Sequence, residues 1–170
     1  RNNSSNTLVR LNNANNDFVG PVTLSNQVNV ELADRNTLTV QGQAGRLSVN
    51  ATEVNQLGDL TVENQATLNA NTISFMNAAN NFAGPVVLNS AGSVNLRDQQ
   101  VIELQGSAGS LNVQAGTAIN QSGALNVNGN SNLAAPTISL TNAANSFGGG
   151  VTVNATQQAT VNASGDLSVG

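Results

Sequence analysis

Apolar and polar residues alternate with a period of two in short segments along the whole chain. Residues 22–24, 38–40 and 60–62 each read apolar-polar-apolar, and similar triplets recur every six to ten residues. A period of two is typical of a β-strand with one buried face, whereas an amphipathic helix has a period of about 3.6 residues. Gly, Asn, Ser and Asp fill the gaps, as they do in turns. The pattern therefore predicts an all-β chain of short strands.

A longer repeat is superimposed on this alternation. Residues 12–22, 76–86 and 141–151 are close copies of one another, and each contains one Phe, so that successive Phe residues are 64 and 65 positions apart. An internal repeat of this kind is the mark of an array in which neighbouring units stack. We expect structural roles for the repeated Phe and for the glycine two positions after it, which are Phe18, Phe82, Phe147, Gly20, Gly84 and Gly149.

A three-residue strand is not stable alone and needs a similar strand above and below it. A coil of parallel strands supplies both neighbours and points Leu, Val, Ile and Ala inward. About nine strand-like segments per copy, three to a coil, predict about eight coils of about 21 residues. With ~4.8 Å between coils the rod is ~38 Å long, and stacked Asn side chains at the turns can form amide ladders. The whole chain, 1–170, is then one solenoid segment with copies at approximately 8–72, 73–137 and 138–170.

The aromatic residues admit two interpretations. Phe18, Phe82 and Phe147 fill a wide place in the core once every three coils, or they form an exposed row that grips a partner. Burial is favoured because aromatic side chains contribute most when they are packed. Phe75 continues an Ile-x-Phe strand and is expected in the core.

The composition excludes most catalytic chemistry. The chain has five Lys plus Arg, nine Asp plus Glu, and neither Cys nor His. It therefore lacks thiolate metal sites, a Cys nucleophile and a Ser-His-Asp triad. A net charge of −4 argues against nucleic acid, and no apolar run is long enough to insert into a membrane. We expect no cofactor and no metal. The sequence shows no signal peptide, and residue 1 is Arg and not Met, so we expect the segment to be a cut or processed piece.

The acidic residues are spread along the chain. Glu53, Asp59 and Glu63 come closest to a cluster, and the second copy has Thr, Ala and Asn at the same positions. Some β-helix proteins cleave polysaccharides with paired carboxylates, but no His, Lys or Tyr is present to assist them. A solvated face is favoured, so we predict that the chain is not an enzyme. A calcium site from these acids stays an alternative, although the chain has no Gly-Gly-x-Gly-x-Asp repeat.

Two Arg residues stand beside aspartates. Arg35 follows Asp34, and Arg97 precedes Asp98. Both are interpreted as exposed charge pairs of small energetic value.

Some β-helix proteins bind ice through flat rows of outward-facing Thr. In this chain the outward residues would be those at the middle of the triplets. Thr23, Val87 and Thr152 occupy one such position in the three copies. A row that changes from Thr to Val makes ice binding a poor alternative.

Asn-x-Ser/Thr sequons are frequent in a chain so rich in these residues. Asn2 and Asn3 begin two of them, and four more are candidate glycosylation sites: Asn50, Asn120, Asn154 and Asn162.

Residues 142–153 and 119–127 resemble repeats of filamentous-haemagglutinin-like exoproteins, very large secreted proteins of Gram-negative bacteria. The resemblance covers nearly the whole chain. It implies a right-handed parallel β-helix, the hand that parallel crossovers generally prefer. It also implies an extracellular or cell-surface stalk for adhesion and biofilm formation. Flanking coils, and a host or matrix surface, are then the expected partners. The alternative is a filament subunit whose neighbouring copies stack end to end through open strand edges.

Overall fold

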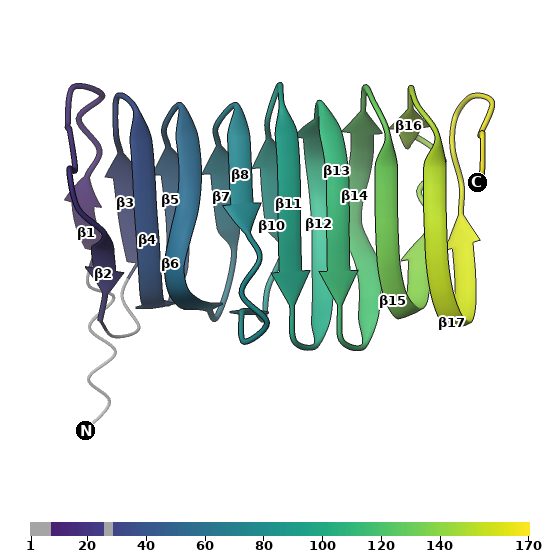
Figure 1. The fold of residues 1–170 in the computed structure, drawn as a ribbon, viewed down its shortest axis with the longest axis horizontal. Coiled ribbons are helices and arrows are strands. Elements are labelled where there is room, and N and C mark those ends of the chain that lie inside the picture. Colours follow the sequence, from purple (N-terminus) through teal and green to yellow (C-terminus); the bar gives the residue numbers. More distant parts are fainter. Residues whose placement is uncertain (1–7, 26–28) are drawn as a thin grey trace.

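Parallel strands stacked into a solenoid make up the computed structural model, which describes residues 8–25 and 29–170. Within these residues seventeen strands form one sheet, and every strand pair in it is parallel. Figure 1 shows the strands following one another along the long axis, with β1 and β17 at opposite ends of the stack. The described residues contain no helix, and therefore no helix that could cross a membrane. The predicted all-β solenoid of about eight coils is confirmed.

The strands belong to three faces that run along the rod. Six long strands bend at a corner and contribute to two faces each: β4 (Thr37–Ala44), β6 (Glu53–Val62), β12 (Val101–Ala108), β14 (Ala118–Val127), β15 (Ser131–Leu140) and β17 (Val151–Val161).

Face 1 joins eight strands by parallel pairing. It contains the second halves of β12 and β14 together with β1 (Leu8–Leu11), β3 (Asn29–Ala33), β5 (Arg46–Asn50), β7 (Ala66–Asn69), β10 (Val86–Asn89) and β16 (Ser146–Phe147).

Faces 2 and 3 are built in the same way. Face 2 contains the first halves of β4, β6, β15 and β17 together with β8 (Thr72–Phe75), β11 (Ser93–Asp98) and β13 (Ser110–Ala115). Face 3 contains the second halves of those four long strands, the first halves of β12 and β14, β2 (Val22–Leu24) and β9 (Asn81–Phe82).

The coils are shorter than the sequence predicted. On face 1, Val30 pairs with Leu47, Leu47 with Ala66, and Ala66 with Val86, at sequence separations of 17, 19 and 20. The spacing is roughly 19 residues and not the longer coil expected from the triplets. The triplet pattern does not predict every strand. Segment 42–44 pairs with 60–62 as a strand, although its Gly and Gln break the alternation of apolar and polar residues.

Because the coils are short, the length of the sequence repeat is not a whole number of coils. Val30 lies on face 1, whereas its equivalent Val94 pairs with Ile73 and Leu111 on face 2. In the third copy, Ala159 pairs with Ile138 on face 3. One repeat therefore spans three and one third coils, and each copy is turned by one face relative to the copy before it.

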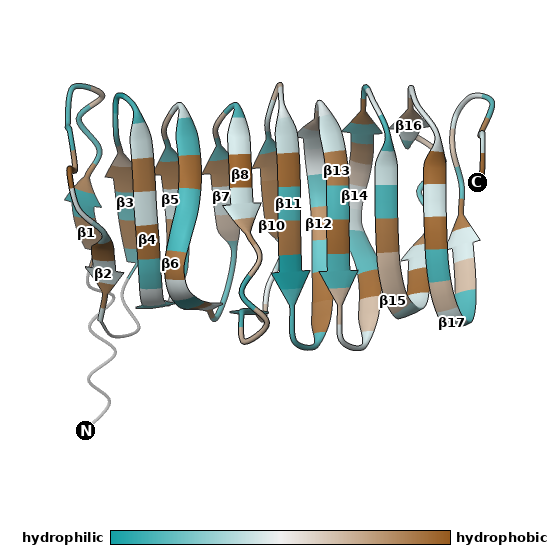
Figure 2. Ribbon diagram, in the orientation of Figure 1, coloured by the Kyte–Doolittle hydropathy of each residue, from teal (hydrophilic) through white to brown (hydrophobic). Residues whose placement is uncertain are grey.

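The core is one continuous column of inward side chains. On face 2, Leu38, Val54 and Ile73 stack directly and have no exposed surface. Figure 2 shows the alternation of apolar and polar residues along the strands that produces this core. Burying one such aliphatic side chain contributes about 1.5–3 kcal/mol. Because each coil packs only on the coils next to it, the stability of the rod builds up coil by coil.

Two glycines lie at bends within long strands, Gly42 between face 2 and face 3 and Gly106 between face 3 and face 1. Gly42 and Gly106 have φ angles of 100° and 108°, and the ladder register shifts beside each of them. A Cβ atom would lie 2.1 Å from the Leu24 carbonyl oxygen at Gly42 and 2.0 Å from that of Leu88 at Gly106. Only glycine fits this conformation and this close approach.

Candidate functional site

The repeated Asn-rich turn holds a buried cluster of side-chain amides. Asn80 has no exposed surface, and its Oδ1 accepts hydrogen bonds from Gln56 Nε2 at 2.8 Å and from the Leu60 backbone N–H at 2.9 Å. Its Nδ2 donates to Gln56 Oε1 at 2.9 Å and to the Phe75 carbonyl at 3.2 Å. Gln56 Oε1 also accepts from the Asn77 N–H at 3.0 Å, so the two amides fasten the turn to the coil below it.

The next copy repeats this cluster. Asn145 is equally buried and makes the reciprocal pair with Gln121, at 2.9 and 3.0 Å. Its Oδ1 accepts from the Leu125 N–H at 2.9 Å, and its Nδ2 donates to the Leu140 and Asn162 carbonyls. The sequence pattern aligns the Asn and the Gln of the two copies but does not predict that they bond to each other between successive coils.

Two aspartates are buried at the corners of the coils. Asp34 and Asp98 are 4% and 2% exposed, so the prediction that they form surface charge pairs with the neighbouring Arg is wrong. Each accepts two backbone hydrogen bonds, and for Asp98 these come from Phe82 and Gln100, both at 2.6 Å. Burial raises the pKa of Asp98, and the two N–H donors oppose this shift. The carboxylates therefore serve as caps for backbone N–H groups.

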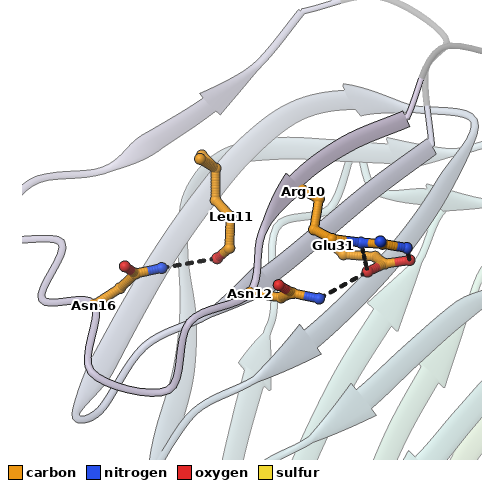
Figure 3. A network of polar contacts seen from close by, with 5 residues as sticks. All are labelled: Arg10, Leu11, Asn12, Asn16 and Glu31. Carbon is orange, nitrogen blue, oxygen red and sulfur yellow. Dashed lines mark hydrogen bonds and ion pairs between the residues drawn. The ribbon is translucent and has the colours of Figure 1, made fainter.

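The arginine side chains find other partners or stay in solvent. Arg35 pairs with Asp17 instead of with its neighbour in sequence. Near the N-terminal end, Glu31 accepts from Arg10 at 2.7 and 3.2 Å and from Asn12 at 2.9 Å, as Figure 3 shows. The hydrogen bond from Arg10 lowers the pKa of Glu31. These contacts lie on the surface and contribute little to stability.

Burial of the repeated Phe residues is confirmed for Phe82 and Phe147, and Phe18 is half-buried against the core. Phe75 is fully buried, and its ring stacks with that of Phe82 at 6.1 Å between centroids. Their spacing of once every three coils is corrected to three and one third, so Phe82 lies on face 3 and Phe147 on face 1.

The marker glycines differ in their surroundings. A Cβ at Gly84 would lie 2.2 Å from the Asn64 carbonyl oxygen, and one at Gly149 would lie 2.6 Å from Asn130 Oδ1. Gly20 has open space around it. A close approach between coils thus explains the glycine in two of the three copies.

The three acidic residues that come closest to a cluster in the sequence share no hydrogen-bond partner in the described structure. Glu53, Asp59 and Glu63 are all exposed, and Glu53 accepts a hydrogen bond from Thr37 at 3.3 Å. Across 8–25 and 29–170, no three acidic, His or Cys side chains come together as metal ligands.

The candidate glycosylation sites are mostly accessible. Asn50, Asn154 and Asn162 are exposed, and Asn120 is half-buried within β14. The Asn162 side chain already donates to the Thr141 carbonyl at 3.1 Å. Glycosylation itself stays a prediction, and the sequons at 2 and 3 lie outside the described residues.

Outward polar side chains form rows along the rod. On face 2, Asn95, Asn112 and Asn132 stack as an amide ladder with two hydrogen bonds of 3.3 Å. The predicted ladder therefore exists, although it lies on a face and not at a turn. The predicted row of residues 23, 87 and 152 does not form, because the three residues occupy faces 3, 1 and 2.

A shallow groove follows the corner between faces 2 and 3. Its lining combines the small residues Ala115, Gly116 and Pro136 with the polar side chains of Arg97 and Gln114. The equivalent corner of the first copy, between faces 1 and 2, has a similar groove lined by residues 50–51, 69–71, 89 and 91. Both grooves combine side-chain amides with small residues.

Comparison with known families matches the chain to DUF5649, described as repeats of unknown function. The match covers residues 27–89 and 91–154, two units whose starts are 64 residues apart, the same interval as that between Phe18 and Phe82. No curated protein and no solved structure matches the chain.

Proposed function

Because the chain belongs to the DUF5649 family of repeats of unknown function, and carries both matched units in one unbroken stack, we propose that it is a structural rod. The rod spaces or carries adhesive parts of a larger protein. It performs this role by being stiff and durable and not by turning over a substrate.

The continuous parallel ladder is the observation that carries this proposal. Parallel pairing links the strands from β1 to β17 into one sheet, so each internal coil satisfies the strand edges of the coils on either side. Buried amide clusters at Asn80 and Asn145 add bonds between coils at the repeated turns. Bending such a rod strains backbone hydrogen bonds and core packing at the same time.

The setting that we propose is extracellular, on a Gram-negative bacterium, within a large secreted adhesin. Support comes from the resemblance of residues 119–127 and 142–153 to filamentous-haemagglutinin-like repeats. The composition agrees with a long-lived material, because the chain has no Cys to oxidise and only 8% charged residues. The proposed partners are flanking coils and a host or matrix surface.

The intact mass of the native polypeptide, measured with electron micrographs of the same preparation, tests the proposal. We expect a mass many times 17.2 kDa on thin rods of fixed length, labelled at the cell surface by antibodies against this chain. Fibres of indefinite length, made of chains no larger than this one, would instead identify a filament subunit. Labelling confined to the cell interior would overturn the adhesin setting.

A further inference from the structure

Glycines from successive coils stack at the corner between face 1 and face 2. They are Gly92, Gly109, Gly129 and Gly149. The Gly109 N–H donates to the Gly92 carbonyl at 2.8 Å, and the Gly129 N–H donates to the Gly109 carbonyl at 2.6 Å. A Cβ atom on Gly129 would lie 2.8 Å from that Gly109 oxygen. The close approach of the coils therefore explains the glycine at position 129.

The glycine at position 129 makes the residue before it chemically labile. Asn128 is the only Asn in the sequence that is followed by Gly. The backbone nitrogen of the following residue can attack the side-chain carbonyl carbon, Cγ, of an Asn, and glycine has no Cβ to obstruct this approach. Asn128 directly follows the last residue of β14 and is exposed, so water reaches its side chain.

Contacts with both neighbouring coils restrain the reacting backbone. The Gly129 N–H is bound to the Gly109 carbonyl, and the Asn128 N–H donates to the Ala108 carbonyl at 3.1 Å. On the opposite side, Gly148 packs so closely that a Cβ atom on it would lie 2.4 Å from the Asn128 carbonyl oxygen. The attack requires the Gly129 nitrogen to lose its proton and the backbone to rotate, and these contacts oppose both changes.

We propose that Asn128 is a site of spontaneous deamidation that the stacked coils keep closed and that reacts only when the coils at this corner separate. In the separated state the Gly129 nitrogen loses its proton and bonds to Asn128 Cγ, the bond from Cγ to the side-chain nitrogen breaks, and ammonia leaves. Water then hydrolyses the cyclic imide. Cleavage at the main-chain carbonyl carbon leaves isoaspartate, and cleavage at Cγ leaves aspartate.

Formation of isoaspartate makes the separation permanent. It adds a methylene carbon to the main chain, so the Gly129 N–H no longer meets the Gly109 carbonyl in register. Aspartate preserves the main chain and adds a negative charge, as the first copy already has at the equivalent Glu63. The inference goes beyond the rod role, because it holds whatever the rod carries.

Comparison of the folded and the unfolded chain tests the proposal. The purified protein is incubated at mildly alkaline pH with and without guanidinium chloride, and peptide mapping by mass spectrometry follows position 128. We expect the folded chain to react about 100-fold more slowly than the unfolded chain, the ratio for a local opening that costs about 2.8 kcal/mol. Equal rates, or no product at Asn128 in the unfolded chain, would overturn the proposal. Asn128→Gln should remove the isoaspartate signal, because its longer side chain cyclises far more slowly.

Two glycine variants in the next coil test whether the coil contacts control the reaction. Gly148→Ala presses a methyl group against the Asn128 carbonyl, whereas Gly150→Ala meets only Asn130 Oδ1 at 3.8 Å, an ordinary contact. In the folded state Gly148→Ala should deamidate about 10-fold faster at Asn128, equivalent to about 1.4 kcal/mol, and Gly150→Ala should match the parent chain. Equal rates for the two folded variants would overturn the role of the contacts.

Asn89 shows whether the effect is local. The N–H of Ser90, which follows it, donates to the Ser107 carbonyl at 3.0 Å at a different coil, so Asn89 is restrained in the same way but lies away from position 148. Its rate should stay unchanged in Gly148→Ala, and acceleration at both Asn residues together would overturn the local control that we propose. If Gly148→Ala does not fold, the comparison of the folded and unfolded parent chain still decides.

Discussion

Replacing Asn80 by Ala removes the centre of the buried amide cluster. Gln56 keeps bonds from its Oε1 to the Asn77 N–H and from its Nε2 to the Gly58 carbonyl. The Leu60 N–H and the Phe75 carbonyl lose the bonds that Asn80 makes to them inside the protein. An unsatisfied buried polar group costs about 1–3 kcal/mol, so the two together lower the free energy of unfolding by about 4 kcal/mol.

Urea unfolding followed by far-ultraviolet circular dichroism measures this loss. For a chain of this size, about 4 kcal/mol corresponds to a drop in Tm of about 10 °C. Hydrogen exchange adds a local readout, because the Leu60 amide should lose its protection from exchange when its acceptor is removed.

Asn77→Ala is the matched control, since it removes only the half-exposed Asx bond to the Ala79 N–H. We expect it to cost about 1 kcal/mol or less. If Asn80→Ala costs no more than Asn77→Ala and leaves the Leu60 amide protected, the cluster does not hold the turn and the reasoning fails.

Three further predictions concern a buried hydroxyl group, a corner glycine and a buried carboxyl group. Ser131→Ala should raise the free energy of unfolding by about 1 kcal/mol, because the buried Ser131 Oγ has no hydrogen-bond partner. Ser90→Ala should lower the free energy of unfolding, because it removes the hydrogen bond from Ser90 Oγ to the Asn71 carbonyl. Urea titration of both variants compares the two changes. Gly106→Ala should unfold the chain at a markedly lower temperature than Gly20→Ala, which has open space for a methyl group, and equal Tm values would count against the strained corner. For Asp98, burial raises the pKa, so the native state keeps a proton that the unfolded chain has released just above the ordinary value of 3.8. The stability of the parent protein relative to Asp98→Asn should therefore fall as the pH rises through this raised pKa, and a difference that grows with pH in titrations from about pH 3 to about pH 7 would contradict the direction of the shift.

The alternation of side chains was enough to predict the fold, because inward Leu, Val and Ile must repeat every second residue along each strand. It could not set the coil length. Segment 42–44 pairs as a strand through its backbone, and its residues Gly, Gln and Ala carry no apolar alternation. Its register depends on the φ of Gly42, which sequence alone does not reveal.

The buried polar side chains could not be predicted from the sequence. Asp34 and Asp98 stand beside Arg residues in a chain with few charges, which favours a surface pair, yet backbone N–H groups at the corners bind them inside. The pairing of Asn80 with Gln56 joins side chains from two successive coils, and only the coil register brings them together. One indication of this pair was present in the sequence, because both the Asn and the Gln recur at equivalent positions in the next copy.

Because one repeat spans three and one third coils, the number of repeats sets both the length of the rod and the direction in which its far end faces. Recombination between two copies in a gene would add or remove one whole repeat unit without disturbing the winding of the coil. Everything distal to that point would then move ~16 Å along the axis and also revolve by a third of a circle. Only gain or loss of three units would change the reach and leave the distal end facing its original direction. Variation in copy number among related genes would thus re-aim the far end of the protein as well as extend it.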